Sequence, residues 1–250
     1  VIIMEKQNTI LLPSLREKET DLPTIDGDLM EELKILMQHS QAFQEMEMMY
    51  ACAIREVRTK AEVLNHEMSV RYHRNPISNI SARVKSSESI AQKLVKKGLP
   101  FTVEAIMANL SDVAGVRIIC EFIDDIYTIA AMLAMQDDLK LIKIKDYIKY
   151  PKPNGYRSYH MIVEIPVFFS KGKTPMRVEI QIRTIAMDFW ASLDHELKYK
   201  KNINSEDEEI IAGELLSCAD RIAETDMIMQ QIRMKLDAVE EDKEKAEIVI

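Results

Sequence analysis

The sequence predicts a mixed α/β domain in which a central sheet of about five strands is flanked by helices, with helical extensions at both ends. The residues from Met176 to Arg183 alternate between apolar and polar without interruption, which is the pattern of a strand with one buried face. Other segments carry apolar residues three and four positions apart, the spacing of amphipathic helices. A long charged segment from Glu206 to about Lys245 predicts a final helix.

Composition fits one large domain, or one domain with helical extensions. The chain has 250 residues, of which 47% are hydrophobic and 30% charged, and its net charge is −8. An acidic chain does not suit a general nucleic-acid binder, although it can still contain a small basic pocket. Three scattered cysteines predict buried thiols in a reducing cytoplasm. No apolar run approaches the roughly 20 residues that span a bilayer, and the apolar start is too short for a signal peptide.

The predicted elements follow one another along the chain. Residues 1–27 have prolines and no clear periodicity, so we expect a loosely docked arm. We expect residues 28–201 to form the main domain and residues 202–250 a helical extension. Helical spacing continues from Asp28 to about Arg74, where Asn75-Pro76 ends it. Further along we predict a helix after Ser86, a helix over Val103–Leu110, a strand over Val116–Phe122, a helix over Asp124–Met135, a strand over Leu139–Tyr147 and a helix over Ile185–Tyr199.

The final helix carries an apolar seam with heptad-like spacing, which suits packing either on the domain or on another subunit. The seam consists of Ile211, Leu215, Cys218, Ile222, Thr225, Met229, Ile232, Leu236 and Val239.

The stretch from Pro151 to His160 predicts a structured loop that leads into a strand. Its Asn-Gly pair favours a turn, because Gly155 takes a positive φ at no steric cost. Such a loop would present Lys152, Asn154 and Tyr156 at the mouth of the sheet, which suits a ligand with a flat face and phosphates. An ordinary polar hairpin loop is the alternative.

Two acidic residues are predicted to lie at the sheet, one on a strand and the other just before a strand. Glu179 lies on the polar face of the strand at 176–183, beside Gln181. Asp112 comes after a helix and just before a strand, with Gly115 and Arg117 following it, and Gly115 would let the backbone turn or approach closely. Paired carboxylates suit Mg²⁺-dependent phosphoryl transfer. The alternatives are a solvated sheet face with cross-strand charge pairs and an ordinary acid at a helix end.

A basic segment precedes and enters the helix after Ser86. Ser86 and Ser87 suit capping positions, and a helix N-terminus attracts anions. Ser89 and Lys93 are four residues apart on one face, and Arg83 and Lys85 lie just before them. A solvated basic helix end is the alternative. Together with the two acids, Arg117 and the loop, this segment describes one polyphosphate site.

These motifs resemble those of the RelA/SpoT-type alarmone synthetases, specifically the small stand-alone synthetases. The resemblance extends from about residue 46 to 201, and the long final helix also fits. The segments that carry it are Arg83–Ser86, Asp112–Arg117, Asp146–His160, Val178–Thr184 and Met187–Glu196.

The resemblance implies a nucleotidyltransferase-like fold and a reaction of the stringent response, in which Mg²⁺ assists transfer of the β,γ-pyrophosphate of ATP to the 3′-hydroxyl of GDP or GTP. Asp112 and Glu179 would then hold Mg²⁺, with Glu179 also the base. The residues implied for ATP are Arg83, Lys85, Ser89, Lys93 and Arg117, of which the two arginines would sandwich adenine. The residues implied for GDP or GTP are Lys152, Asn154, Tyr156, His160 and Gln181, with Tyr156 stacking on guanine.

The resemblance also implies a homotetramer. We expect no hydrolase activity, because the chain has no His-Asp dipeptide and no spare length for a hydrolase domain. Product activation is not expected either, since the region around Arg58, Glu62, Asn79 and Ser81 lacks the basic and aromatic set that it would need. Two other functions stay open: the same transfer onto adenine nucleotides or the 3′ end of tRNA, and a catalytically silent nucleotide- or RNA-binding regulator.

Overall fold

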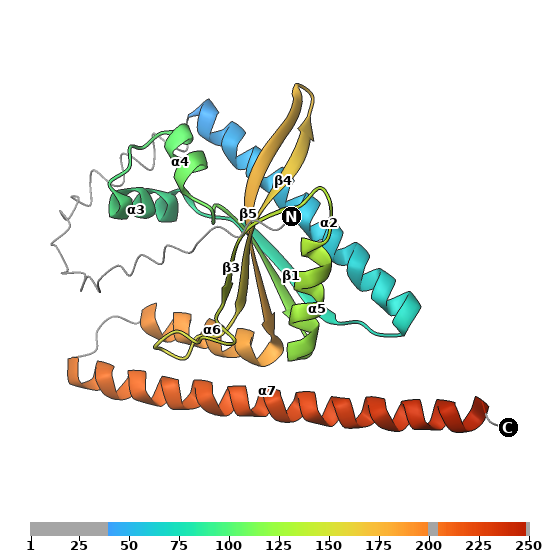
Figure 1. The fold of residues 1–250 in the computed structure, drawn as a ribbon. Coiled ribbons are helices and arrows are strands. Elements are labelled where there is room, and N and C mark those ends of the chain that lie inside the picture. Colours follow the sequence, from blue (N-terminus) through green and yellow to red (C-terminus); the bar gives the residue numbers. More distant parts are fainter. Residues whose placement is uncertain (1–39, 200–204, 249–250) are drawn as a thin grey trace, which may run out of the picture.

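The computed structural model describes residues 40–199 and 205–248, and the expected arm at 1–27 lies outside the described residues. Five strands form one sheet in the order β1-β2-β5-β4-β3, as predicted (Figure 1). The pair β2–β5 is parallel, and the other three neighbouring pairs are antiparallel. The strands are β1 (Ile77–Val84), β2 (Ala114–Cys120), β3 (Lys140–Asp146), β4 (Tyr159–Phe169) and β5 (Gly172–Thr184).

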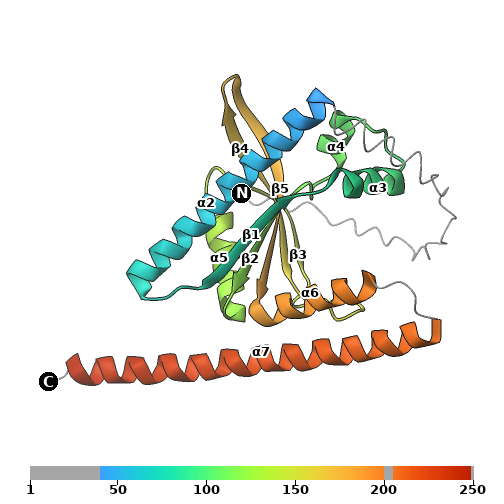
Figure 2. The ribbon, with the colours of Figure 1, turned by 180° about the vertical axis from the view of Figure 1, so that it is seen from behind.

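The helices cover the two faces of the sheet unequally. On one side lie α2 (Gln41–Tyr72) and α5 (Ile123–Ala134), which close that face (Figures 1 and 2). On the other side α3 (Ser87–Lys97) and α6 (Ile185–Tyr199) lie at opposite ends, with the short α4 (Val103–Asn109) beside α3. The long α7 (Ser205–Ile248) passes below α6 and α5. The sheet face between α3 and α6 therefore stays open.

The core lies between α2, α5 and the closed face of the sheet. Val178, Ile180 and Ile182 of β5 are fully buried, which confirms the predicted apolar face of that strand. Helix α2 buries residues three and four positions apart, also as predicted, and each buried aliphatic or aromatic side chain contributes about 1.5–3 kcal/mol. These residues of α2 are Phe43, Met46, Tyr50, Ala53, Ile54, Val57, Ala61, Leu64 and Met68.

Strand β1 was not predicted from the sequence. It is an edge strand whose residues are mostly exposed, so it lacks the apolar alternation that identifies a strand with one buried face. Arg83 consequently lies on a strand of the sheet and not at a basic helix end. The predicted strand at 116–122 also ends early, because Phe122 is the residue before α5 and its ring packs under the Arg233 guanidinium, 4.9 Å away.

Two further expectations need correction. Of the three cysteines, which are all free, only Cys120 is buried, whereas Cys52 is half-buried and Cys218 is exposed. Gly115 lies inside β2, has no positive φ, and would bring an added Cβ no nearer than 3.8 Å to the Arg83 carbonyl oxygen. It therefore serves neither a turn nor a close backbone approach. No helix within the described residues is long and apolar enough to cross a membrane.

Helix α7 packs on the domain along only part of its predicted seam. Ile211, Leu215 and Ile222 are half-buried. In the second half of the helix the contacts are polar: Gln230 donates to Asp124, and Arg233 pairs with Asp125 at 3.3 Å. The remaining seam residues are exposed, and these are Cys218, Thr225, Met229, Ile232, Leu236 and Val239.

Candidate active site

The register of the strands places the predicted polar residues in two neighbouring rows on the open face. In the first row Arg83 of β1 lies opposite Gly115 of β2, which lies opposite Glu179 of β5. Directly opposed residues point to the same face of a sheet, so Arg83 and Glu179 flank a position that has no side chain. In the second row the residues are Ser81, Arg117, Gln181 and His160, in that order across four strands.

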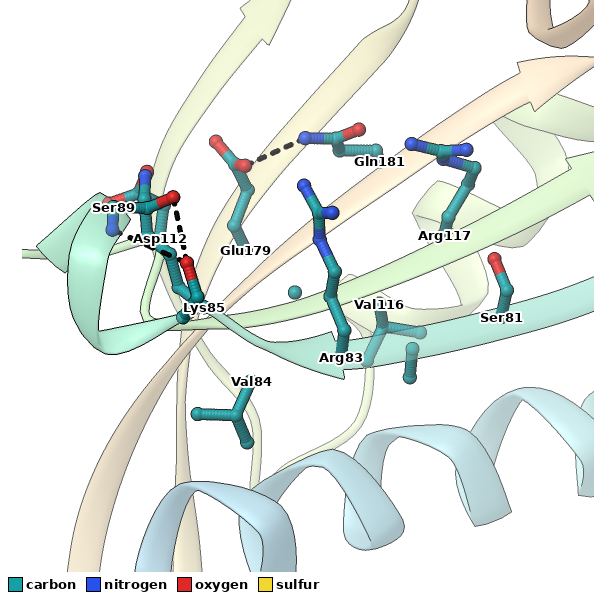
Figure 3. A pocket seen from close by; sticks show the side chains of 13 residues that line it. Ser81, Arg83, Val84, Lys85, Ser89, Asp112, Val116, Arg117, Glu179 and Gln181 are labelled. Carbon is teal, nitrogen blue, oxygen red and sulfur yellow. Dashed lines mark hydrogen bonds and ion pairs between the residues drawn. The ribbon is translucent and has the colours of Figure 1, made fainter. Parts of the chain in front are cut away.

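Apart from His160, the residues of these rows form the floor of a pocket of about 500 Å³ (Figure 3). That volume suits a nucleotide-sized ligand. Because Gly115 adds no Cβ, the space between Arg83 and Glu179 stays open. The polar residues that line the pocket are Ser81, Arg83, Lys85, Ser86, Ser89, Asp112, Arg117, Glu179 and Gln181.

Asp112 stands at one end of this floor, just before β2. The backbone N–H of Lys85 donates to the carbonyl of Val113 at 2.8 Å, which ties the end of β1 to the Asp112 segment. The Lys85 and Lys93 ammonium groups both lie 2.7 Å from Asp112 Oδ2. Burial alone would raise the pKa of Asp112, but the two lysines outweigh burial and hold that pKa below its usual value. Oδ1 is buried and accepts no hydrogen bond within the described residues.

Helix α3 brings two more of the predicted residues to Asp112. Ser86 is the N-cap, as predicted, and its Oγ accepts the Ser89 backbone N–H at 3.3 Å, whereas Ser87 is buried and does not cap. Ser89 lies in the first turn and lines the pocket. Lys93 follows one turn later and reaches Asp112. Ser86 and Ser89 therefore line the same pocket as Asp112, and Lys93 contacts Asp112.

Glu179 is ionised by its neighbours on the sheet. Burial alone would raise its pKa, but hydrogen bonds from His160 and Gln181 outweigh burial and keep the pKa of Glu179 below its usual value. Gln181 Nε2 donates to Glu179 Oε2 at 2.8 Å, and His160 Nδ1 lies 3.5 Å from Oε1. The negative charge of Asp112 acts on Glu179 in the opposite direction, so the two carboxylates are close enough to interact.

A chain of contacts continues from Glu179 to the loop at 151–158. Tyr156 Oη lies 2.9 Å from His160 Nε2. The Lys152 ammonium lies 4.5 Å from the centre of the Tyr156 ring, a cation–π contact that covers one face of that ring. The loop turns at Gly155, which has a φ of +84°, as the Asn-Gly pair predicted.

The loop residues lie beside the pocket and not on its floor. His160 contacts the pocket through Glu179, and Tyr156 contacts His160. Asn154 points elsewhere: its Nδ2 donates to Asp194 Oδ2 of α6 at 3.4 Å, and its Oδ1 accepts the Tyr156 backbone N–H at 3.3 Å. The Asn154 side chain therefore holds the shape of the loop.

Sequence reasoning missed Arg183 and Asp188, which join the two groups of residues. Arg183 is only 4% exposed, and its Nη2 donates to Tyr156 Oη at 2.5 Å and to Gln181 Oε1 at 2.9 Å. Its Nη1 lies 3.0 Å from Asp188 Oδ1, which also lies 3.2 Å from Arg117 Nη1. Arg183 was expected on the polar face of its strand, and only its place on the same face as Glu179 and Gln181 could have indicated a role.

The carboxylates of this site suit a hard divalent cation whose other ligands are water molecules and substrate oxygens. Within residues 40–199 and 205–248 no group of three His, Cys, Asp or Glu side chains is placed to hold a metal. Asp112 Oδ1 is a buried carboxylate oxygen without a partner, and ionised Glu179 lies near it. Mg²⁺ is commonly held by one or two carboxylates and substrate phosphates, so the residues present fit it.

Comparison with known proteins shows the family of this chain. Residues 82–204 match the region found in RelA/SpoT proteins. GTP pyrophosphokinase YwaC of Bacillus subtilis (strain 168) is 40% identical over 208 residues, which cover 83% of this chain and 97% of that protein.

Solved structures show the same fold. The small alarmone synthetase 1 from Bacillus subtilis, bound to its product pppGpp, gives a TM-score of 0.71 at 32% identity and covers 78% of this chain and 98% of its own. The same synthetase bound to AMPCPP gives a TM-score of 0.65 at 28% identity, with 79% and 99% covered. This chain therefore belongs to the small alarmone synthetases of the RelA/SpoT family.

Proposed function

We propose that this protein is a GTP pyrophosphokinase that transfers the β,γ-pyrophosphate of ATP to the 3′-hydroxyl of GDP or GTP, producing AMP and ppGpp or pppGpp. The observation that carries the proposal is the position of Asp112 and Glu179. They are two ionised carboxylates at one pocket, with a cationic group of residues on one side and an aromatic loop on the other. A relative that is 40% identical is named GTP pyrophosphokinase, which supports the same reaction.

ATP would occupy the side of the pocket formed by β1, α3 and β2. Lys85, Ser89 and Lys93 gather where the triphosphate would lie, and the α3 N-terminus adds its own favourable field for an anion. Arg83 and Arg117 come from neighbouring strands of the open face and suit contact with the two faces of adenine (Figure 3). A relative that was solved bound to AMPCPP supports an adenine nucleotide as one of the two ligands.

GDP or GTP would occupy the side that contains Tyr156, His160 and Gln181. Stacking of guanine on the Tyr156 ring would contribute roughly 1–3 kcal/mol. The Lys152 ammonium and the Arg183 guanidinium both lie over that ring, 4.5 Å and 5.1 Å from its centre. A base that stacks on the face covered by Lys152 would displace the ammonium, which would then become available for the phosphates of the acceptor. Asn154 acts here by holding the loop.

In the transfer, the 3′-oxygen of the acceptor would attack the β-phosphorus of ATP while the bond to the α,β-bridging oxygen breaks and AMP leaves. Glu179 would accept the hydroxyl proton as the new bond forms. A carboxylate with a lowered pKa is a weak base, so its main contribution is to orient the hydroxyl and to take the proton late. Lys85, Lys93 and Arg117 would offset charge on the transferring group.

Asp112 and Glu179 would hold Mg²⁺. Bound there, the ion would offset the negative charge of the phosphates and help to align them. Lys85 and Lys93 share Oδ2 of Asp112, whereas Oδ1 remains available for the ion.

One assay tests the function. The protein is incubated with Mg²⁺ and γ-labelled ATP, and GDP, GTP, AMP and tRNA are offered in turn. We expect label on GDP or GTP with release of AMP. Label found only on AMP or tRNA would show that this molecule, and not a guanine nucleotide, is the acceptor. Absence of any transfer would favour a nucleotide-binding regulator.

We also propose a homotetramer, a cytoplasmic location and a synthetase unit at residues 28–201. Ile228, Ile232 and Leu236 are exposed at spacings of four along α7, and a second copy of this chain would cover such a stripe. ATP and guanine nucleotides are cytoplasmic metabolites, and three free thiols suit a reducing compartment. Native mass spectrometry tests the assembly: a tetramer that Ile232→Asp dissociates supports it, and a wild-type monomer contradicts it.

A further inference from the structure

Helix α7 passes directly behind the loop that contains Tyr156. A Cβ added to Gly155 would lie 2.5 Å from Ala219 Cβ and 3.3 Å from Leu216 Cδ1, both of which belong to α7. Gly155 also has a φ of +84°, so glycine is required twice at this position. The loop backbone therefore rests on the helix with no room for a side chain between them.

Polar contacts fix the loop to the same support. Arg157 Nη2 lies 3.2 Å from Asp220 Oδ1, one residue beyond Ala219 on α7, and the Arg157 side chain is 18% exposed. Asn154 reaches Asp194 of α6. Helix α6 is in turn joined to α7, because Trp190 Nε1 donates to the Leu215 carbonyl oxygen at 3.0 Å.

A second point of contact lies two turns further along α7. Thr184 Oγ1 donates to Asp226 Oδ2 at 2.6 Å, and both residues are buried. The same Oγ1 accepts the Met187 backbone N–H at 3.1 Å and so caps α6. Thr184 follows Arg183, whose guanidinium contacts Tyr156. Helix α7 thus supports both the loop and the end of the strand that holds the Tyr156 hydroxyl.

Most residues assigned to ATP have no comparable contact. Within the described chain, the hydrogen bonds and ion pairs of Lys85, Ser89 and Lys93 join β1, α3 and Asp112, and none reaches α7. Arg117 reaches α6 through Asp188 at 3.2 Å but does not contact α7 itself. A displacement of α7 would accordingly disturb the acceptor half of the site far more than the ATP half.

We propose that Gly155, Ala219 and Asp220 are positioning residues, through which the C-terminal helix holds the acceptor loop in its binding shape. The proposal rests on the proposed function for the identity of the acceptor, but the mechanical support of the loop by α7 does not. Loss of that support should raise the KM for GDP and leave the KM for ATP unchanged, because α7 contacts only the acceptor half.

The test uses a pair of variants on α7 and a pair of glycine variants. Ala219→Leu pushes bulk against Gly155, and its control is Ala238→Leu, the same change at an exposed position of the same helix. Gly155→Ala approaches the contact from the loop. Its control is Gly98→Ala, where φ is also positive, at +62°, but an added Cβ meets nothing within 4 Å.

Two readouts are collected on the full chain: hydrogen exchange of the amides at 152–157 without nucleotide, and the KM for GDP and for ATP. Ala219→Leu and Gly155→Ala should each speed loop exchange and raise the KM for GDP by about tenfold to a hundredfold, a range typical of a misplaced binding group. The two controls should resemble the wild type in loop exchange and in the KM for GDP.

The outcomes separate this inference from the proposed function. If loop exchange and the KM for GDP in Ala219→Leu match those of Ala238→Leu, the inference is wrong. If the wild type transfers nothing to guanine nucleotides but loop exchange rises in Ala219→Leu and Gly155→Ala alone, the proposed function fails and the support by α7 stands. Trp190, the single tryptophan, reports by fluorescence whether α6 and α7 remain packed in each variant.

Discussion

The two halves of the site hold their charged groups in different ways. On the ATP side, Lys85 and Lys93 converge on one oxygen of Asp112, and the exposed Arg83 side chain has no hydrogen bond or ion pair within the described chain. On the acceptor side, Arg183 and His160 are hydrogen-bonded to Tyr156. The cations of the ATP half can therefore exchange their present partners for a ligand, whereas the side chains of the acceptor half are held in place by hydrogen bonds to one another.

Substitutions in the two halves should therefore act in different ways. A cation that contacts only solvent or a carboxylate contributes to ligand binding through its charge, so its removal should weaken the binding of one ligand. A buried, fully bonded group such as Arg183 contributes through geometry, and its removal leaves several partners unsatisfied. Glu179, which Gln181 and His160 contact, lies where the two halves meet, and Asp112 lies on the ATP side, close enough to interact with Glu179.

The largest effect is expected at those carboxylates. Glu179→Gln and Asp112→Asn each remove a charge while they keep the side-chain shape, and each should lower kcat by about 10²–10⁴-fold, the range typical of a positioned acid or base. AMP release in the presence of GDP measures the rate, and circular dichroism checks the fold. Transfer at the wild-type rate in either variant would remove the assigned roles.

Filling the open position between the rows should weaken ATP binding. Gly115→Val adds a branched side chain between Arg83 and Glu179, and overpacking of this kind costs about 1–3 kcal/mol, so the KM for ATP should rise roughly fivefold or more. Gly115→Ala is the matched control, because its Cβ would lie 3.8 Å from the nearest atom and has room. Equal ATP affinity in the Val and Ala variants would show that ATP does not occupy this space.

Breaking the link between the halves should affect both ligands. Arg183→Lys keeps the charge but loses the fork that joins Tyr156, Gln181 and Asp188, and bonds to charged groups contribute about 1.5–3 kcal/mol. We expect tenfold weaker GDP binding or more, and a smaller loss for ATP through Asp188 and Arg117. Isothermal titration with each nucleotide alone and with both measures these affinities. Unchanged GDP affinity would exclude Arg183 as a positioning residue.

The smallest effect concerns pH. The lysines hold the pKa of Asp112 below its unfolded value, so this carboxylate stabilises the fold above the unfolded pKa of about 3.9, and the contribution is lost as pH falls through the folded pKa. Asp112→Asn should melt about 2–4 °C below the wild type at pH 7, and the gap should close below pH 4. A difference in melting temperature that widens as pH falls would contradict the stabilising sign of this interaction.

The sequence could predict the parts of this molecule whose patterns are local. Strand β5 and helix α6 follow from unbroken periodicity, and the turn at Gly155 follows from its Asn-Gly pair. Strand β1 could not be predicted, because an exposed edge strand buries too little for an alternating pattern.

The site divides in the same way. Most residues assigned to ATP meet in one pocket, since short motifs place them near strand ends. The arrangement of Arg183, Asp188 and α7 around Tyr156 depends on contacts between residues 25 to 63 positions apart, such as Ser158 with Arg183 and Arg157 with Asp220, which no local pattern encodes.

A crossed measurement of Michaelis constants tests most directly whether the site is divided into two halves. Arg83→Ala removes an exposed cation of the ATP side, and Tyr156→Ala removes the ring of the acceptor side. We expect Arg83→Ala to raise the KM for ATP alone, and Tyr156→Ala to raise the KM for GDP by about 5- to 150-fold, which corresponds to 1–3 kcal/mol of stacking, with the KM for ATP unchanged. If Tyr156→Ala weakened ATP as much as GDP, or if Arg83→Ala weakened GDP, the division of the site into two halves would be contradicted.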